Sequence, residues 1–145
     1  LLDRNAHWEA CGTAEYLLEQ GRNVTYVTPL LTAGADLEPS NAALFYQRVR
    51  PKGMQVIVNT DLKEIAADAV VLVDVYTGEE QHLTDIHTVV MAIGRRSNDR
   101  LFHELSGSCP VFRIGDCRAP RFLEHAILEG DEIGRNLEVR IAASS

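Results

Sequence analysis

The chain has 145 residues, of which 46% are hydrophobic and 24% charged, and its formal net charge is −7. This length suits one domain with a sizeable core, and the composition is that of an ordinary globular protein. The acidic balance, without a Lys/Arg cluster to neutralise phosphates, excludes a typical nucleic-acid surface, and no apolar run approaches the roughly 20 residues of a membrane span.

The cysteines are odd in number and form no C-x-x-C pair: they are Cys11, Cys109 and Cys117. This usage is typical of neither a disulfide framework nor a zinc or iron–sulfur site. We therefore expect neutral thiols, no metal ion bound by this chain, and a cytoplasmic location. The opening residues, LLD, carry no signal peptide or initiating Met, and we expect them to continue a longer polypeptide.

The first part of the chain predicts parallel strands joined by helices. Apolar, β-rich runs at residues 1–3 and 23–29 flank a helical pattern over residues 7–21. A right-handed crossover makes these two strands parallel neighbours. A second helix over residues 39–53 then leads to a third strand over residues 54–59.

The pattern changes after the third strand. Residues 61–92 hold short β-runs around a Thr-Gly-Glu turn, which predicts an antiparallel meander, and residues 88–94 should return to the main sheet. A short helix over 99–106, a last strand over 110–116 and a closing helix over 121–139 follow. The expected fold class is three-layer α/β: a Rossmann-like nucleotide-binding domain with a parallel sheet and a small antiparallel β-meander insert.

The first turn, RNAHWEACG, lacks the glycines of a dinucleotide-binding fingerprint. Asn5, His7 and Ala10 stand where the three glycines would let the backbone approach a pyrophosphate at the helix N-terminus. Thr28 stands where an Asp or Glu would take a ribose hydroxyl. This pattern predicts a degenerate turn that has lost NAD(P); a turn that tolerates the substitutions and still binds NAD(P)H is the alternative.

Two other predicted strand ends contain a glycine and are also candidates for nucleotide binding. Gly115 and Asp116 follow the last strand and precede the closing helix, a position where a carboxylate can hold a ribose or sugar-phosphate hydroxyl. Asp116 could instead cap the helix or hold the loop. Gly94 ends the strand TVVMAIG and would allow a close crossing over a neighbouring backbone, or mark a plain exit into a loop.

The segments MAIGRRSND and FRIGDCRAPRFLEHAILEG, in this order and spacing, resemble the C-terminal part of flavoproteins with two dinucleotide-binding domains. The pattern IGDCxAPRxxxxAIxEGxxxGRxL is most similar to the tail of the trimethylamine dehydrogenase and 2,4-dienoyl-CoA reductase group, the large relatives of old yellow enzyme. The resemblance covers essentially the whole chain.

The resemblance implies a division of the chain. Residues 1–98 would be the degenerate NAD(P)-binding-type half with its meander, and residues 99–145 would complete an FAD- or ADP-binding domain that begins before residue 1. Gly115 and Asp116 would meet the ribityl or pyrophosphate part of FAD, or ADP in the same place. The backbone of Glu124, His125 and Ala126 would lie near the flavin ring.

The function implied is that of one part of a multi-cofactor, flavin-dependent oxidoreductase, either amine or N-methyl dehydrogenase-like or enoyl reductase-like. FMN and a 4Fe-4S cluster would belong to the preceding part of the polypeptide, and an electron-transfer partner is expected. The chain would carry no catalytic residue and would be inactive alone. The alternatives are an NAD(P)H-binding reductase domain and a non-catalytic scaffold that docks an electron acceptor.

Overall fold

The computed structural model describes residues 1–143, which form two compact units. Unit 1 comprises Leu1–Gly94, and unit 2 begins at Arg95. The domain boundary expected after residue 98 concerns a larger protein and stays a prediction.

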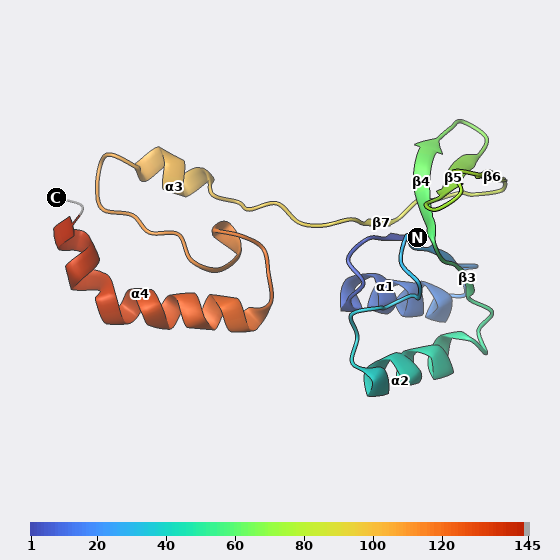
Figure 1. Ribbon diagram of the computed structural model, residues 1–145, viewed down its shortest axis with the longest axis horizontal. Helices are drawn as coiled ribbons and strands as arrows, with labels where there is room; N and C mark the ends of the chain where they lie inside the picture. The colour runs from blue at the N-terminus through green and yellow to red at the C-terminus, as the bar shows by residue number, and fades with distance from the viewer. Residues whose placement is uncertain (144–145) are drawn as a thin grey trace. The chain divides into compact units, whose positions relative to one another are not determined.

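A four-stranded parallel sheet lies at the centre of unit 1, in the order β3-β2-β1-β7 (Figure 1). The strands are β1 (Leu2–Asp3), β2 (Thr25–Val27), β3 (Gln55–Ile57) and β7 (Met91–Ala92). Every strand pair is parallel, and Leu2 of β1 pairs with both Val27 and Met91. The sheet confirms the predicted parallel arrangement and the return of the chain to it after the meander.

Helices α1 (Trp8–Glu19) and α2 (Pro39–Val49) follow β1 and β2 and pack on one face of this sheet (Figure 1). Two right-handed crossovers in succession place both helices on the same side. The layer between helices and sheet is closely packed, with Tyr26, Phe45 and Val49 fully buried. Small residues on α1, among them Ala10 and Ala14, allow this close approach.

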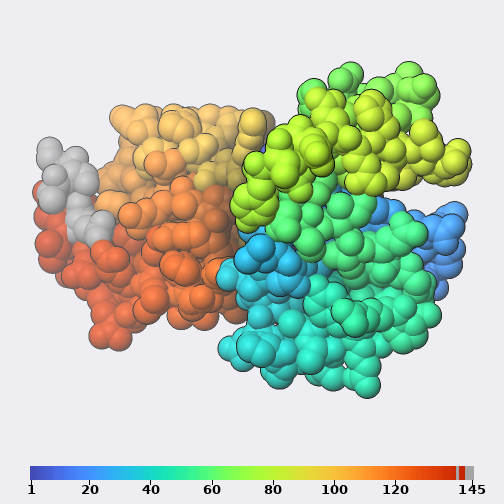
Figure 2. Space-filling model, turned by 45° about the vertical axis from the view of Figure 1, so that its right-hand side comes forward, coloured from blue at the N-terminus to red at the C-terminus, as the bar shows by residue number. Residues whose placement is uncertain are grey.

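The meander forms the third layer of unit 1 and is antiparallel, as expected. Its strands are β4 (Thr60–Ile65), β5 (Val70–Asp74) and β6 (Glu80–Leu83). Val70 and Leu72 pack against Leu2 and Val27 of the parallel sheet, forming a second, smaller core. In the space-filling view the yellow-green meander and the teal α2 form opposite ends of unit 1 (Figure 2).

Unit 2 contains α3 (Arg100–Leu105), a single 3-10 turn, η1 (Gly115–Cys117), and the long helix α4 (Leu123–Ala143). Both helices were expected, but the last strand is a correction. Ile114 is extended, with φ −136° and ψ 159°, yet no strand among residues 1–143 pairs with the segment before it. An extended segment becomes a strand only when a neighbour completes its hydrogen bonds, and Gly115–Asp116 already turn into η1.

Candidate functional site

The Gly115–Asp116 turn requires a glycine at its first position. Gly115 has φ +60°, and a Cβ there would lie 3.3 Å from the Cβ of Ala126 on α4. The turn is closed by backbone N–H groups of Arg118 and Ala119, which donate to the Gly115 carbonyl at 3.0 and 3.1 Å. The left-handed conformation and the close contact with Ala126 explain why this position requires a glycine.

Asp116 presents its carboxylate at the surface of this turn. Oδ1 accepts one long hydrogen bond, 3.4 Å, from the backbone N–H of Arg121. A carboxylate has about four acceptor positions, so Asp116 retains the capacity to accept a ligand hydroxyl. The residue therefore fits the group that the sequence pattern implies.

Glu129 of α4 holds the same turn from the other side. Its Oε2 accepts from the Gly115 N–H at 2.7 Å, while Oε1 accepts from Arg118 Nη1 at 3.1 Å and from the Arg121 guanidinium. Glu129 is only 8% exposed. The hydrogen bond from Arg121, followed by that from the Gly115 N–H, holds the pKa of the Glu129 carboxyl below its usual value.

Sequence reasoning gave Glu129 no role. A signal was present, because Arg121 and Glu129 are both fixed positions of the pattern IGDCxAPRxxxxAIxEG. The pattern does not show that the Glu129 side chain reaches back to the Gly115 amide.

Glu124, His125 and Ala126 lie in the first turn of α4. Ala126 lies directly against Gly115, so the start of the helix and the Gly115–Asp116 turn are adjacent in unit 2. The His125 ring lies over Phe122 with 6.5 Å between ring centroids. Helix N-terminal amides favour negative charge, which is the electrostatic contribution that this end of α4 can make.

In unit 1, a buried carboxylate occupies the turn that was expected to be degenerate. Asp3 is fully buried, and its Oδ1 accepts from the backbone N–H groups of Asn5 and Ala6 at 2.8 and 2.9 Å. Its Oδ2 accepts from the Tyr26 hydroxyl at 2.5 Å. Two backbone donors of the turn are therefore satisfied inside the protein. The sequence pattern did not single out Asp3.

The three expected glycine positions have separate structural roles. Asn5 donates from its side-chain amide to Glu9 at 2.7 Å, His7 is the N-cap residue of α1, and Ala10 is buried in the core. The left-handed residue of the turn is Ala6, with φ +61°.

The loop between β2 and α2 lies over this turn. The Asp36 N–H donates to the Ala6 carbonyl at 3.0 Å, and Ala33 and Leu37 are buried in the main core. Thr28, at the end of β2, is fully buried, and its hydroxyl accepts from the Leu30 N–H at 3.3 Å. The end of β2 is thus occupied by the protein's own groups.

Gly94 ends the segment that returns to the parallel sheet, and its close backbone crossing stays a prediction. It uses a conformation that favours glycine, with φ +125°, but a Cβ there would meet no heavy atom of the described residues within 4 Å.

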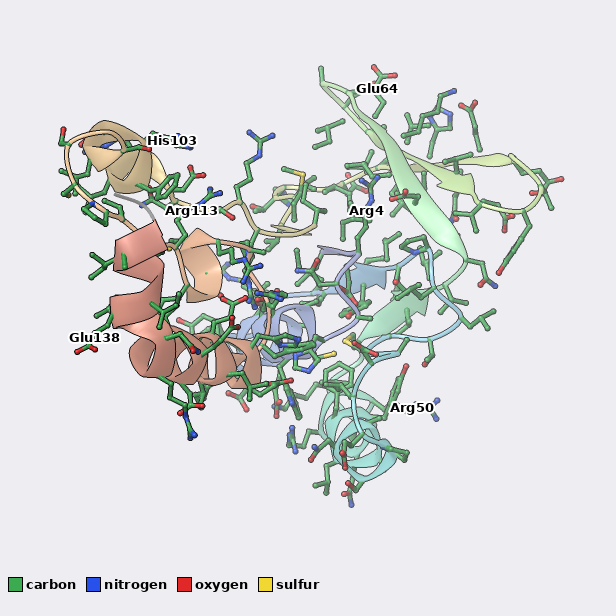
Figure 3. The ribbon with its side chains drawn as sticks, turned by 60° about the vertical axis from the view of Figure 1, so that its left-hand side comes forward. Arg4, Arg50, Glu64, His103, Arg113 and Glu138 are labelled. Carbon is green, nitrogen blue, oxygen red and sulfur yellow. The ribbon has the colours of Figure 1, made fainter. Side chains whose placement is uncertain are left out.

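A polar cluster joins α3 to the extended segment of unit 2. Asp99 Oδ2 accepts from Arg113 Nη1 at 2.5 Å and lies 3.2 Å from His103 Nε2. The Arg113 guanidinium stacks on the Phe102 ring, 4.5 Å from its centroid. Figure 3 shows Arg113 and His103 on the same side of unit 2. These contacts orient the segment that leads to Gly115.

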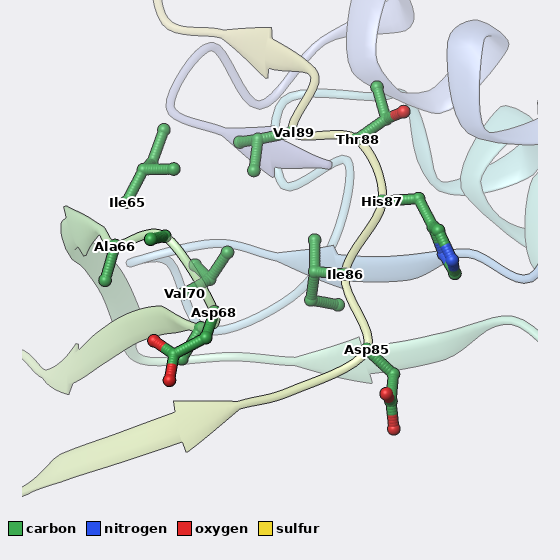
Figure 4. A pocket seen from close by; sticks show the side chains of 11 residues that line it. Ile65, Ala66, Asp68, Val70, Asp85, Ile86, His87, Thr88 and Val89 are labelled. Carbon is green, nitrogen blue, oxygen red and sulfur yellow. The ribbon is translucent and has the colours of Figure 1, made fainter.

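A cavity of about 380 Å³ in unit 1 lies between residues 65–70 and residues 85–89 (Figure 4). The polar side chains around it, Asp68, Asp85, His87 and Thr88, point in different directions (Figure 4). Over the described range 1–143, no group of three or more His, Cys, Asp or Glu side chains could hold a metal ion. In the same range no helix is both long enough and apolar enough to cross a membrane.

The parallel sheet, the helices that cover it and the turns at the strand ends define a Rossmann-type α/β protein. The family model of the pyridine nucleotide-disulphide oxidoreductases matches residues 9–130, and the chain belongs to this family. Membership confirms the prediction of an oxidoreductase domain of the FAD- and NAD(P)-binding kind.

Individual relatives agree with the predicted resemblance. Dimethylamine dehydrogenase of Hyphomicrobium sp. (strain x) is 26% identical over 167 residues, which cover 95% of this chain and 22% of the relative. Histamine dehydrogenase from Rhizobium sp. 4-9 is 25% identical with a TM-score of 0.86, over 94% of this chain and 22% of that one. A 2-naphthoyl-CoA reductase is 28% identical with a TM-score of 0.72, over 86% of this chain and 19% of that one.

These relatives confirm the similarity to the trimethylamine dehydrogenase and 2,4-dienoyl-CoA reductase group. The chain spans about a fifth of the length of each of the three.

Proposed function

We propose that this chain is the nucleotide-binding part of a larger flavin-dependent oxidoreductase, in which unit 2 supplies one wall of an FAD or ADP site. The observation that carries the proposal is the Gly115–Asp116 turn, which follows an extended segment and packs on the first turn of α4. A strand end that meets a helix N-terminus in this way is the usual position of a dinucleotide.

The residues of this wall would bind and orient the nucleotide. Asp116 would accept a hydrogen bond from a ribityl or ribose hydroxyl, and Gly115 would let the ligand approach the backbone closely. The amides of Glu124, His125 and Ala126 would face negative charge, since they lie in the first turn of α4. When bound, FAD would supply the redox chemistry, and none of these side chains would take part in a bond-breaking step.

The rest of the polypeptide would complete the site. The extended segment before Gly115 has no strand beside it in the described range, and no described apolar side chain of unit 2 is buried. Both features support a neighbouring sheet supplied by a longer chain. FMN and a 4Fe-4S cluster would lie in that part, an electron-transfer partner would accept electrons, and the unpaired thiols support a cytoplasmic location.

We further propose that the turn after β1 does not bind NAD(P). Its amides at Asn5 and Ala6 already donate to Asp3, and the loop after β2 bonds to the Ala6 carbonyl. Titration of the chain with NADH, followed by nicotinamide fluorescence, should give no saturable binding. Tight binding at this turn would favour the NAD(P)H-reductase alternative.

The proposed function is tested by Asp116→Ala in the full-length protein. A charged hydrogen bond contributes about 1.5–3 kcal/mol, so FAD or ADP affinity should fall roughly ten- to hundredfold. Thermal unfolding of the apo form should hardly change, because Asp116 is exposed. Glu138→Ala, at an exposed position on α4, is the control. A large loss of apo stability with normal cofactor content would make Asp116 a structural residue instead.

A further inference from the structure

We propose that Glu129 is a positioning residue for the nucleotide: it holds Gly115, Arg118 and Arg121 so that Asp116 faces the ligand. This inference rests on the proposed function. Glu129 itself would touch no ligand.

The burial of Glu129 needs an explanation. It is 8% exposed, and it is the one buried side chain among the described residues of unit 2. Burying a carboxylate is costly unless hydrogen-bond donors and opposite charges compensate, and a buried ion pair is often no more stabilising than apolar residues of similar volume. A carboxylate at this position therefore does more than fill space, because its three donors specify where the loop lies.

The two carboxylate oxygens contact opposite ends of the loop that carries Asp116. Oε2 accepts from the Gly115 N–H, just before Asp116, and Oε1 accepts from Arg118 and Arg121, just after it. The backbone N–H of Arg121 in turn donates to Asp116 Oδ1. Asp116 thus lies inside a ring of contacts that Glu129 closes, and a supporting shell of this kind sets the geometry of a binding group.

Charge gives Glu129 a second role. Arg118 and Arg121 follow Asp116 closely in the sequence, and both guanidinium groups are directed to Glu129. Without the negative charge on Glu129, these guanidinium groups would be available to pair with Asp116. Such a pair would compete with the ligand hydroxyl for the same carboxylate oxygens.

The test is a double-mutant cycle in the full-length protein, with FAD and ADP as the probes. Glu129→Gln keeps the size of the side chain, removes its charge, and should weaken nucleotide binding about tenfold. Glu138→Gln, the same change at an exposed position on the same helix (Figure 3), should leave binding unchanged. Glu129→Asp, which keeps the charge, should restore part of the affinity.

The double mutant decides how Glu129 acts. If Glu129 acts through Asp116, Glu129→Gln should cause no further loss of nucleotide affinity in the Asp116→Ala background. A purely structural role would make the two losses of affinity additive. Should Glu129→Gln fail to fold, Arg121→Lys offers the same cycle. It keeps the charge but removes the guanidinium, whose Nη2 donates to Glu129 Oε1 and whose Nε donates to the Ala119 carbonyl. Additive losses, or unchanged binding in both variants, would overturn the inference.

Different outcomes of these experiments would contradict the proposed function and this inference. A full-length protein that binds neither FAD nor ADP, or that binds them equally well with Asp116→Ala, would overturn the proposed function and the inference together. Loss of binding with Asp116→Ala but not with Glu129→Gln would leave the proposed function standing and overturn the inference alone.

Discussion

Asp3 shows how a single buried carboxylate can occupy the backbone donors of the turn that follows a strand. Its carboxylate accepts from two backbone N–H groups and from the Tyr26 hydroxyl, and it is fully buried. A buried charge persists only with such compensation. Asp3 occupies the turn with an anionic group of the protein itself.

Asp3→Ala should therefore destabilise unit 1 strongly. It would leave the Tyr26 hydroxyl and two backbone N–H groups without their acceptor, at a cost of about 3 kcal/mol. Urea unfolding followed by far-UV circular dichroism measures this loss. Asp68→Ala, at an exposed position of the same unit, is the matched control. Equal midpoints for the two variants would contradict a structural role for Asp3.

Cys11 provides a second test at the residue scale. Burial raises the pKa of its thiol from 9.0 to about 11, with the nearby negative charge of Asp3 adding to the effect. The neutral thiol is therefore favoured by the fold, and this contribution to stability is complete below pH 9.0 and lost as the pH rises through about 11.

At pH 8, iodoacetamide should modify the exposed Cys109 in the native chain and leave Cys11 unmodified until urea is added. Mass spectrometry of tryptic peptides reports each site. The unfolding midpoint should also fall steeply above pH 10 in the parent and less steeply in Cys11→Ala. Rapid labelling of Cys11 under native conditions would contradict its assignment to the core.

The loop between β2 and α2 is the element that closes the first turn of unit 1. Gly34 lies at its centre with φ +63°, and a Cβ there would lie 2.9 Å from the Cys11 Sγ and 2.9 Å from the Leu37 Cδ1. The loop can thus approach α1 closely only because Gly34 has no side chain. Its position depends on packing as well as on backbone conformation.

Comparing Gly34→Ala with Gly53→Ala separates these two effects. Gly53 has φ +80° but no heavy atom within 4 Å of a Cβ, so its substitution should cost about 1 kcal/mol from backbone strain alone. Gly34→Ala should cost roughly 2–4 kcal/mol, since overpacking adds to the same strain. Chemical unfolding measures both, and equal losses would show that the loop does not need this close contact.

At the scale of the whole molecule, apolar burial is distributed unevenly. Both buried apolar clusters belong to unit 1, whereas the described apolar side chains of unit 2 all stay at least partly exposed. Leu123, Ile127 and Leu128 on α4, for example, are 74%, 62% and 66% exposed. Local stability follows the density of buried contacts, so unit 1 should be locally much more stable than unit 2.

Hydrogen exchange on the isolated 145-residue chain should show this difference. Amides of β1, β2 and α1 should exchange slowly, and those of α4 should exchange orders of magnitude faster. The same chain should bind FAD and ADP with a Kd weaker than about 1 μM, because one wall of the proposed site is insufficient. Equal protection in both units, or sub-micromolar binding by calorimetry, would contradict this expectation.

Much of the fold was predictable from local pattern. The helical spacing in residues 7–21, the glycine that ends it, and the alternating β-runs of the meander correctly predicted α1 and strands β4 to β6. The resemblance of IGDCxAPRxxxxAIxEG to a known group was also correct. Such a motif contains residues that a particular backbone conformation requires, as Gly115 is required by its left-handed φ.

The sequence by itself thus determined the order and type of most elements and the family, since these depend on near-neighbour periodicity and on residues with special backbone conformations. Tertiary structure alone decided how Asp3 and Glu129 are used. Asp3 is compensated only because the fold brings Tyr26 of β2 within hydrogen-bond distance. Glu129 is compensated only because the loop before α4 brings Arg118 and Arg121 to it. It also decided that residues 110–114 form no strand in this chain, because a strand is defined by the neighbour that completes its hydrogen bonds.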